Sequence, residues 1–232
     1  MPLLPAPSIA REIFADALPS AERYAEFLAG PGVDRGLIGP REVERLWERH
    51  LLNCVVMAEV IPADATVVDI GSGAGLPGLV LAIARPDLSV TLLEPLLRRT
   101  VFLQECVDLL GLSNVEVRRA RAEEAADEFA ADIVTARAVA PLERLAGWAL
   151  PLLRPGGELL ALKGERAAAE LEEASEILSE FGVRSAEVLQ VGHGKVEPPA
   201  TIVRVVAGKA PRPSGRRTSS RRGGRRRGER KR

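Results

Sequence analysis

The feature that most constrains the fold is a glycine-rich turn placed directly after a short β-branched run. Residues 66–70 read TVVDI, and residues 71–78 read GSGAGLPG. An apolar run of this length predicts a buried strand, and the glycines permit a tight turn where side chains would clash. A helix is predicted at 79–84, so its free N–H groups lie next to the turn. This order predicts a site for an anionic or closely fitting cofactor.

Strands and helices alternate after this turn. Further strands are predicted at 89–93, 115–117, 133–135, 158–162, 184–190 and 201–206. Helices are predicted between them at 97–110, 123–129, 142–153 and 166–181. This alternation predicts an α/β fold with a doubly wound, mostly parallel, seven-stranded sheet. About ten residues join the last two strands, which favours a C-terminal antiparallel hairpin.

The chain divides into three predicted parts. Residues 1–62 form an N-terminal helical cap, with apolar positions at helical spacing that are clearest between 43 and 58. Residues 63–208 form a Rossmann-like domain. Residues 209–232 hold twelve Lys and Arg and one acidic residue, a net charge of +11, so the other 208 residues carry −11. We expect this basic tail to be disordered and to bind phosphate backbones, with a solubilising extension as the alternative.

Composition narrows the class of protein. Hydrophobic residues make up 46% of the chain, as in globular proteins, and no apolar run approaches the roughly 20 residues that cross a bilayer. No secretory signal is predicted at the start. Cys54 and Cys106 are the two cysteines and lie far apart, so we expect buried free thiols and no metal site. A cytoplasmic monomer without membrane attachment is expected.

The glycine turn favours S-adenosylmethionine over a dinucleotide cofactor. Residues 73–78 do satisfy the G-x-G-x-x-G pattern, which leaves a nicotinamide enzyme open as an alternative. The crowded Gly-x-Gly-x-Gly spacing, however, suits a cofactor without a pyrophosphate. Glu94 ends the next predicted strand, where it can accept hydrogen bonds from both ribose hydroxyls. The predicted cofactor contacts in this region are Asp69, Gly71, Gly73, Gly75 and Glu94.

Several short motifs between residues 42 and 206 together resemble one family. They read RHLLN at 49–53, DIGSGAGLPG at 69–78, LLE at 92–94, RRTVFL at 98–103, RAEE at 121–124, TARA at 135–138 and LALKG at 160–164. In this order they resemble the RsmG family of bacterial ribosomal RNA methyltransferases, also called glucose-inhibited division protein B. The resemblance implies a class I S-adenosylmethionine-dependent methyltransferase. The family methylates N7 of one guanine in the decoding region of 16S ribosomal RNA, in the small ribosomal subunit.

The resemblance also implies roles for particular residues. Gly71 and Leu76 match cofactor contacts in the glycine turn. Ala122 and Glu123 match a contact on the adenine side, and Arg137 matches a further cofactor-site residue. This sequence has Glu94 and Asn53 where the family more often has Asp, and no Asn-Leu-Thr motif precedes the Arg-His pair.

The chemistry of the implied target agrees with these residues. Guanine N7 carries a lone pair and no proton, so methyl transfer needs no general base and positioning should dominate. Arg121, Arg137 and Lys163 each follow a predicted strand, and guanine offers N7 and O6 as acceptors to such cations. We predict that one of them reads O6 and the others hold phosphates, with simple surface cations as the alternative. His50 is predicted to pack or to cap a helix.

Three functional hypotheses stay open from the sequence. The first is a methyltransferase acting on guanine N7 of 16S ribosomal RNA, with the basic tail on its phosphate backbone. The second is a methyltransferase of the same fold that acts on a small molecule or a protein and does not need the tail. The third is a non-catalytic, cofactor-binding module associated with the ribosome.

Overall fold

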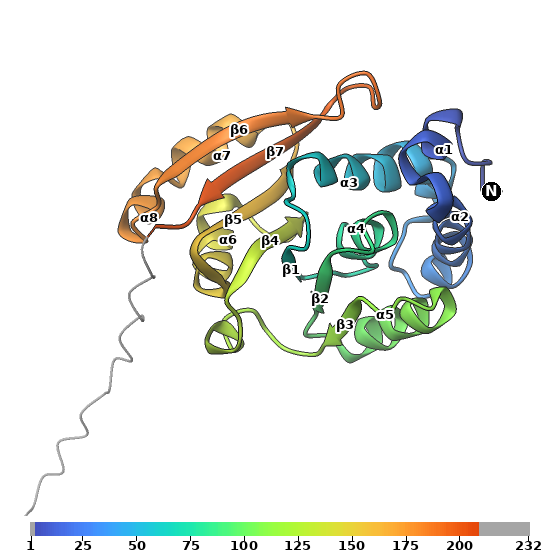
Figure 1. The fold of residues 1–232 in the computed structure, drawn as a ribbon, viewed down its shortest axis with the longest axis horizontal. Helices are drawn as coiled ribbons and strands as arrows, with labels where there is room; N and C mark the ends of the chain where they lie inside the picture. Colours follow the sequence, from blue (N-terminus) through green and yellow to red (C-terminus); the bar gives the residue numbers. More distant parts are fainter. Residues whose placement is uncertain (1–2, 209–232) are drawn as a thin grey trace, which may run out of the picture.

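A seven-stranded sheet forms the centre of the protein in the computed structural model, which describes residues 3–208 (Figure 1). Its strand order is β3-β2-β1-β4-β5-β7-β6. Neighbours are parallel from β3 to β5, and β7 is antiparallel to both β5 and β6. The predicted mostly parallel sheet with a C-terminal hairpin is therefore confirmed. The predicted disordered tail lies outside the described residues.

The strands lie over the predicted apolar runs, and β5 begins five residues before its predicted start at 158. They are β1 (Thr66–Ile70), β2 (Ser89–Leu93), β3 (Val115–Arg118), β4 (Ala131–Arg137), β5 (Leu153–Lys163), β6 (Ser185–Val191) and β7 (Ala200–Val206). Side chains of a strand alternate between the two faces of its sheet. In β1, Val67 belongs to the hydrophobic cluster on one face, whereas Val68 and Ile70 belong to the cluster on the other.

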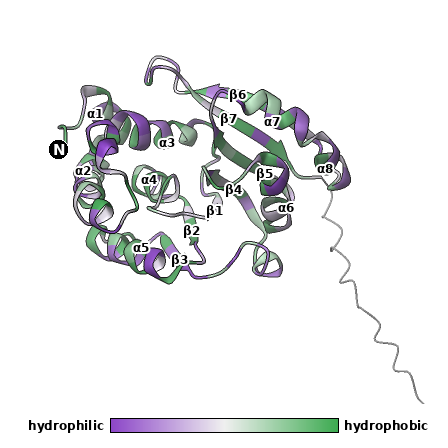
Figure 2. Cartoon of the chain, turned by 180° about the vertical axis from the view of Figure 1, so that it is seen from behind, coloured by the Kyte–Doolittle hydropathy of each residue, from purple (hydrophilic) through white to green (hydrophobic). Residues whose placement is uncertain are grey.

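Helices cover both faces of the sheet. On one face lie α4 (Gly78–Ala84), α5 (Leu97–Leu110) and the N-terminal cap. On the other lie α6 (Leu142–Ala149), α7 (Ala167–Glu173) and α8 (Ser175–Glu180). Figure 2 shows apolar residues along the strands at the centre of the sheet and polar residues on the outer sides of the helices. Both faces are thus buried, which is the arrangement of a doubly wound fold.

The N-terminal cap is helical, as predicted. It begins with α1 (Ser8–Phe14), which the sequence did not predict, and α2 (Leu18–Phe27). A second helical run changes its winding along its length, through η3 (Pro40–Arg45), η4 (Leu46–Leu52), α3 (Asn53–Val55) and η5 (Val56–Val60). Apolar residues of the cap share one hydrophobic cluster with α4, α5 and the sheet. The cap is therefore packed as part of the same core.

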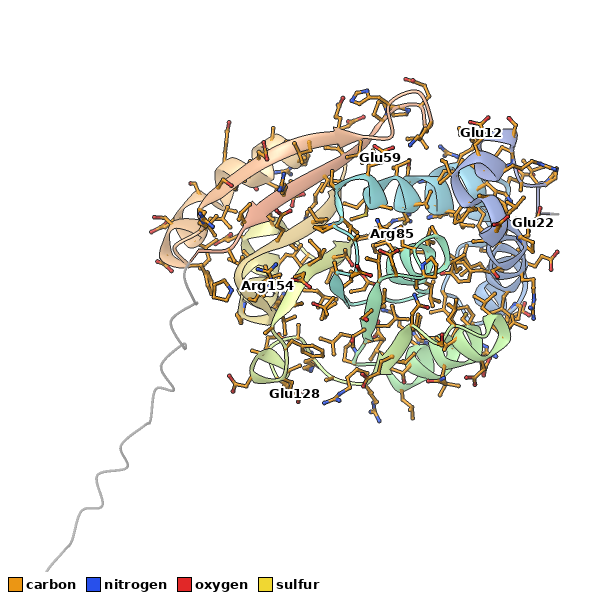
Figure 3. All side chains as sticks on the ribbon, in the orientation of Figure 1. Glu12, Glu22, Glu59, Arg85, Glu128 and Arg154 are labelled. Carbon is orange, nitrogen blue, oxygen red and sulfur yellow. The ribbon has the colours of Figure 1, made fainter. Side chains whose placement is uncertain are left out.

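Polar contacts fasten the end of the cap to two other elements (Figure 3). The Arg85 guanidinium, just after α4, donates to the carbonyls of Ala58, Ile61 and Pro62. The Glu59 carboxylate accepts hydrogen bonds from Lys195 Nζ at 2.8 Å and Gly192 N at 3.0 Å, both in the loop between β6 and β7. These contacts hold the end of the cap to the segment before β2 and to the loop between β6 and β7.

Two predicted helices differ from the structure. Residues 123–129 form a turn followed by one short 3-10 segment, η6 (Ala126–Glu128), so the helix predicted there is wrong. Ala125 of this segment and Ala122 just before it are buried against the sheet, and tertiary packing overrides the helix propensity of the Ala and Glu residues. The predicted helix at 166–181 is two helices, α7 and α8, which meet at Ala174. Within residues 3–208, no helix is long and apolar enough to cross a bilayer.

Candidate active site

Two adjoining cavities lie at the carboxyl ends of the parallel strands. The smaller, of about 380 Å³, lies at the ends of β1 and β2, and the larger, of about 960 Å³, lies at the ends of β4 and β5. Ala138 and Val139, directly after β4, line both. The chain leaves β1 toward β2 on one side and reaches β4 on the other, and ligands of open α/β sheets bind at such a switch point.

The glycine turn between β1 and α4 has a backbone that requires glycine. Gly71, Gly73 and Gly75 all have positive φ, at 64°, 59° and 99°. A Cβ on Gly75 would lie 2.4 Å from Leu79 Cδ1 and 2.8 Å from the Tyr24 hydroxyl oxygen. That hydroxyl, on α2 of the cap, donates a hydrogen bond of 2.7 Å to Ala74 O. The cap therefore supports the turn from behind.

Asp69 lies beneath this turn and does not line either cavity. Its side chain is fully buried, and it accepts hydrogen bonds from Thr135 Oγ1 at 2.9 Å and Gly78 N at 3.2 Å. Burial raises the pKa of Asp69 to about 7, an effect larger than the opposing effect of these hydrogen bonds. The structure thus departs from the predicted direct cofactor contact, because the carboxylate is used to join β1, β4 and the start of α4.

Glu94 lines the smaller cavity at the end of β2 and is 1% exposed. Its carboxylate accepts hydrogen bonds of 3.0 Å from Gly73 N and from Leu96 N. An ionised carboxylate has about four acceptor positions, so two remain for a ligand. Arg99 also lines this cavity, and its Nη1 lies 3.6 Å from Glu94 Oε2. The buried Nε of Arg99 has no hydrogen-bond partner in the described part of the chain.

Other predicted cofactor residues are divided between the cavity wall and the turn behind it. Gly71, Ala122 and Glu123 line the smaller cavity, together with Arg121, which the sequence predicts as a cation for guanine or phosphate. Gly73, Gly75 and Leu76 do not line it and form the turn itself. On the opposite wall, Arg144 of α6 stacks over the Trp148 ring with its guanidinium carbon 4.7 Å from the ring centroid. No motif in the sequence pointed to that pair.

Arg137 and Lys163 line the larger cavity, whereas Arg121 lies in the smaller one. The three predicted cations are therefore not on one rim. Lys163 Nζ donates to Ala140 O at 2.8 Å and to Glu170 Oε2 at 2.7 Å. Although burial opposes it, the hydrogen bonds from Lys163 and Leu142 N hold the pKa of Glu170 below its ordinary value. Lys163 thus fixes the connection between β4 and α6.

Arg137 is held by the cap. Its Nη1 donates to Cys54 Sγ at 3.3 Å, and its Nη2 contacts His50 Nδ1. Cys54 and Cys106 are both buried free thiols, as expected. Asn53 and Arg49, from the same helical run, line the larger cavity beside Arg137. The RHLLN motif pointed to this run, but nothing in the sequence paired it with β4.

The residues of the smaller cavity fit a nucleoside. Glu94 offers acceptors for two hydroxyls, Gly71 provides close backbone approach, and apolar Ile70 and Leu93 line the wall.

The family model described as rRNA small subunit methyltransferase G matches residues 17–197. The chain belongs to this family. Membership in it, together with the fold, implies S-adenosylmethionine as the cofactor and removes the nicotinamide alternative. The resemblance seen in the sequence motifs is confirmed.

Relatives and solved structures agree with this placement. A Thermobifida fusca protein named ribosomal RNA small subunit methyltransferase G is 68% identical over 201 residues, covering 87% of this chain and 85% of the relative. One of the same name from Streptomyces avermitilis is 60% identical over 210 residues, covering 90% and 88%. The fold is shared with a precorrin-6y C5,15-methyltransferase from Geobacter metallireducens, at TM-score 0.51 and 21% identity, over 73% of this chain and 90% of that one. It is also shared with a SAM-dependent O-methyltransferase from Thermotoga maritima, at TM-score 0.51 and 16% identity, over 68% and 64%.

Proposed function

We propose that this protein transfers a methyl group from S-adenosylmethionine to N7 of a guanine in the decoding region of 16S ribosomal RNA. One observation carries the choice of guanine. Arg137 lines a cavity of about 960 Å³ that adjoins the cofactor cavity, and two of the five N–H donors of its guanidinium are used by Cys54 and His50. The remaining donors match the N7 and O6 acceptors on one edge of guanine.

The surroundings of this cavity suit an acceptor that has no proton to lose. S-adenosylmethionine supplies an electrophilic methyl group, and the residues of the chain bind and orient the two reactants. Glu170, a carboxylate that lines the larger cavity, is engaged by Lys163 and Leu142 N. Positioning alone is worth about 7–11 kcal/mol of activation free energy for well-oriented reactants. A site built on orientation, without a dedicated base, is sufficient for N7.

We assign the predicted residues to three tasks. Glu94, Gly71, Ala122, Glu123 and Arg121 contact the cofactor in the smaller cavity. Asp69, Gly73, Gly75 and Leu76 shape the turn that holds it, and Arg137 meets the base. Lys163 holds the wall between β4 and α6.

The substrate in this proposal is the small ribosomal subunit, and the basic tail adds contacts to its phosphates. The tail begins after Gly208, just beyond β7, which starts beside Lys163 and ends beside Glu158. The end of β7 therefore lies at the edge of the sheet opposite the two cavities, near α8 in Figure 1. We also propose that residues 1–62 form a helical cap and residues 63–208 the Rossmann-like domain. The protein is further proposed to be a cytoplasmic monomer.

The test uses small ribosomal subunits that lack the modification, purified protein and tritiated S-adenosylmethionine. We expect label in 16S ribosomal RNA at one guanine, where borohydride and aniline cleave the chain as they do at N7-methylguanine. Arg137→Ala should bind S-adenosylhomocysteine like the parent protein and transfer no label. Cofactor binding without any label in RNA would overturn the proposal, and label at an exocyclic amine would overturn the N7 assignment.

A further inference from the structure

Three side chains from separate elements form a connected chain between the cap and the sheet. The Oε2 atom of Glu42, in η3, lies 3.0 Å from the Nε2 atom of His50, in η4. The other ring nitrogen, His50 Nδ1, contacts Arg137 Nη2 at the end of β4. Arg137 lines the larger cavity, but His50 does not. The imidazole therefore lies behind the guanidinium and does not meet the substrate directly.

The contacts of His50 fix which ring nitrogen carries the proton. A guanidinium only donates hydrogen bonds, so Nδ1 must accept from Arg137 and the proton must lie on Nε2, where it is donated to Glu42. His50 is 8% exposed. Burial and then the positive charge of Arg137 lower the pKa of His50 to about 4, against the opposing effect of Glu42, while Arg49 adds to the lowering. The imidazole is thus neutral at neutral pH.

The arrangement limits the freedom of the Arg137 side chain. A free arginine side chain has several rotatable bonds, and ordering it costs conformational entropy. His50 and Cys54 hold two nitrogens of the guanidinium from the side of the cap. The group is therefore oriented before any substrate arrives.

We propose that Glu42 and His50 are positioning residues, with Glu42 fixing the His50 tautomer and His50 orienting the Arg137 guanidinium toward the base in the larger cavity. This proposal rests on the proposed function, because it gives Arg137 a task on the substrate. It adds that the N-terminal cap supplies part of the catalytic arrangement. It also explains why an arginine that must contact RNA is bonded to a neutral imidazole and not to a carboxylate, which would compete with RNA for its charge.

Two substitutions at His50 separate positioning from a structural role. Asparagine places an acceptor near the position of Nδ1 and loses the link to Glu42, whereas glutamine keeps the link to Glu42 and loses the acceptor at Nδ1. We expect His50→Asn to keep kcat within about threefold of the parent and His50→Gln to lower it about tenfold or more, as for a displaced positioning group. KM for S-adenosylmethionine should stay within about twofold in both. His193→Gln, in the exposed loop between β6 and β7, is the matched control and should leave both constants unchanged.

The reverse order, with His50→Gln more active than His50→Asn, would show that only the bond to Glu42 matters and would overturn the proposal. Parent-like kcat in both variants would overturn it as well.

A second measurement does not depend on activity. The chain has two histidines, so nitrogen-15 histidine labelling gives two sets of ring signals, and His193→Gln identifies those of His50. We expect the Nε2–H tautomer with Nδ1 as acceptor, unchanged between pH 8 and pH 6, and a mixture of tautomers in Glu42→Ala. A proton on Nδ1, or a charged ring at pH 6, would overturn the proposal. This result stands even if ribosomal RNA is not methylated, so a failure of the proposed function is distinguished from a failure of the positioning chain.

Discussion

Glu94 and Asp69 are carboxylates near the ends of neighbouring strands, and their surroundings give them different tasks. Glu94 lines the smaller cavity and has acceptor positions left after its bonds to Gly73 N and Leu96 N. Asp69 is enclosed beneath the turn, with both oxygens engaged by Gly78 and Thr135. The first is placed to hold a ligand, and the second holds the backbone that surrounds it.

We expect Glu94→Ala to weaken binding of S-adenosylhomocysteine about 100-fold, because two hydrogen bonds to a charged acceptor are lost, at about 1.5 kcal/mol each. Isothermal titration calorimetry measures this affinity. Glu116→Ala is the control, since Glu116 lies on β3 with an exposed side chain and lines neither cavity. Equal affinities of Glu94→Ala and the parent would contradict the ribose assignment.

Asp69 makes stability depend on pH in a predictable direction. Its pKa is raised from 3.8 to about 7 by burial, so between these values the folded state binds a proton that the unfolded state releases. The contribution of Asp69 to the free energy of unfolding is therefore fully present at low pH and is lost as the pH rises through about 7.

Asp69→Asn removes this dependence. We expect the free energy of unfolding of the parent, relative to the variant, to fall by roughly 3 kcal/mol between pH 5 and pH 8. Urea denaturation at several pH values measures the difference. The lowered pKa of His50 acts in the opposite direction but is present in both proteins and cancels in the comparison. A difference that stays constant with pH would refute the expectation.

The sequence predicts which residues lie at strand ends better than it predicts which side chains they contact. Glu94 and Arg137 were expected at strand ends because β-branched runs define those ends. The sequence does not predict where the Asp69 side chain points, because a carboxylate at a strand end has the same sequence pattern whether it faces a cavity or the core. The contact of Arg137 with His50 joins positions 87 residues apart, and it depends on how the cap packs on the sheet. Composition and periodicity carry no information on such a contact.

At the scale of elements, the start of α4 packs against the sheet with no space to spare. A Cβ on Gly78 would lie 2.4 Å from Leu92 Cδ2 and 2.8 Å from Asp69 Oδ2. Close approach of α4 to β2 is what places the turn next to Glu94. The glycine at this position therefore serves packing, since its φ is not among the positive ones.

We expect Gly78→Ala to lower the free energy of unfolding by about 2–4 kcal/mol, because Leu92 and Asp69 must move to admit the methyl group. Gly147→Ala in α6 is the matched control, since a Cβ there meets no atom within 4 Å. That change should stabilise the protein by up to about 1 kcal/mol through helix propensity. Urea denaturation of both variants provides the values, and equal effects would show that α4 has room to adjust.

The elements predicted with correct bounds are those with strong local signals. The bounds of β1, β2 and α5 agree with the sequence, and α5 ends at Gly111, whose φ of 63° suits the left-handed position after a helix. The helix predicted at 123–129 is absent because Ala125 is buried against the sheet and tertiary packing overrides helix propensity. The cap's changing winding was also not predicted, because apolar spacing shows that a segment is helical but does not fix its exact winding.

At the scale of the whole molecule, β7, which precedes the basic tail in the sequence, ends at the edge of the sheet opposite the two cavities. A tail that begins there has its attachment away from the target base. Its charge of +11 from Lys209 to Arg232 nearly all comes from arginine. In the proposed function, such a segment would add affinity for RNA without choosing the nucleotide.

We expect truncation after Gly208 to weaken binding to small ribosomal subunits and to reduce the slope of log K against log salt by at least about 3. Affinity for S-adenosylhomocysteine and the melting temperature should not change. Filter binding between 50 and 300 mM salt measures the slope. A variant with every tail arginine replaced by glutamine should behave like the truncation, whereas an unchanged slope in either would exclude an electrostatic role for the tail.

The stretch that lines both cavities has one further consequence. Ala138 takes a positive φ of 53°, an uncommon conformation for a residue with a side chain, and Val139 follows it. Any shift of this stretch caused by a ligand on one side alters the surface offered to the ligand on the other. In the proposed function, binding of nucleoside and RNA would then be thermodynamically linked, and each ligand would change the affinity of its counterpart by an equal factor.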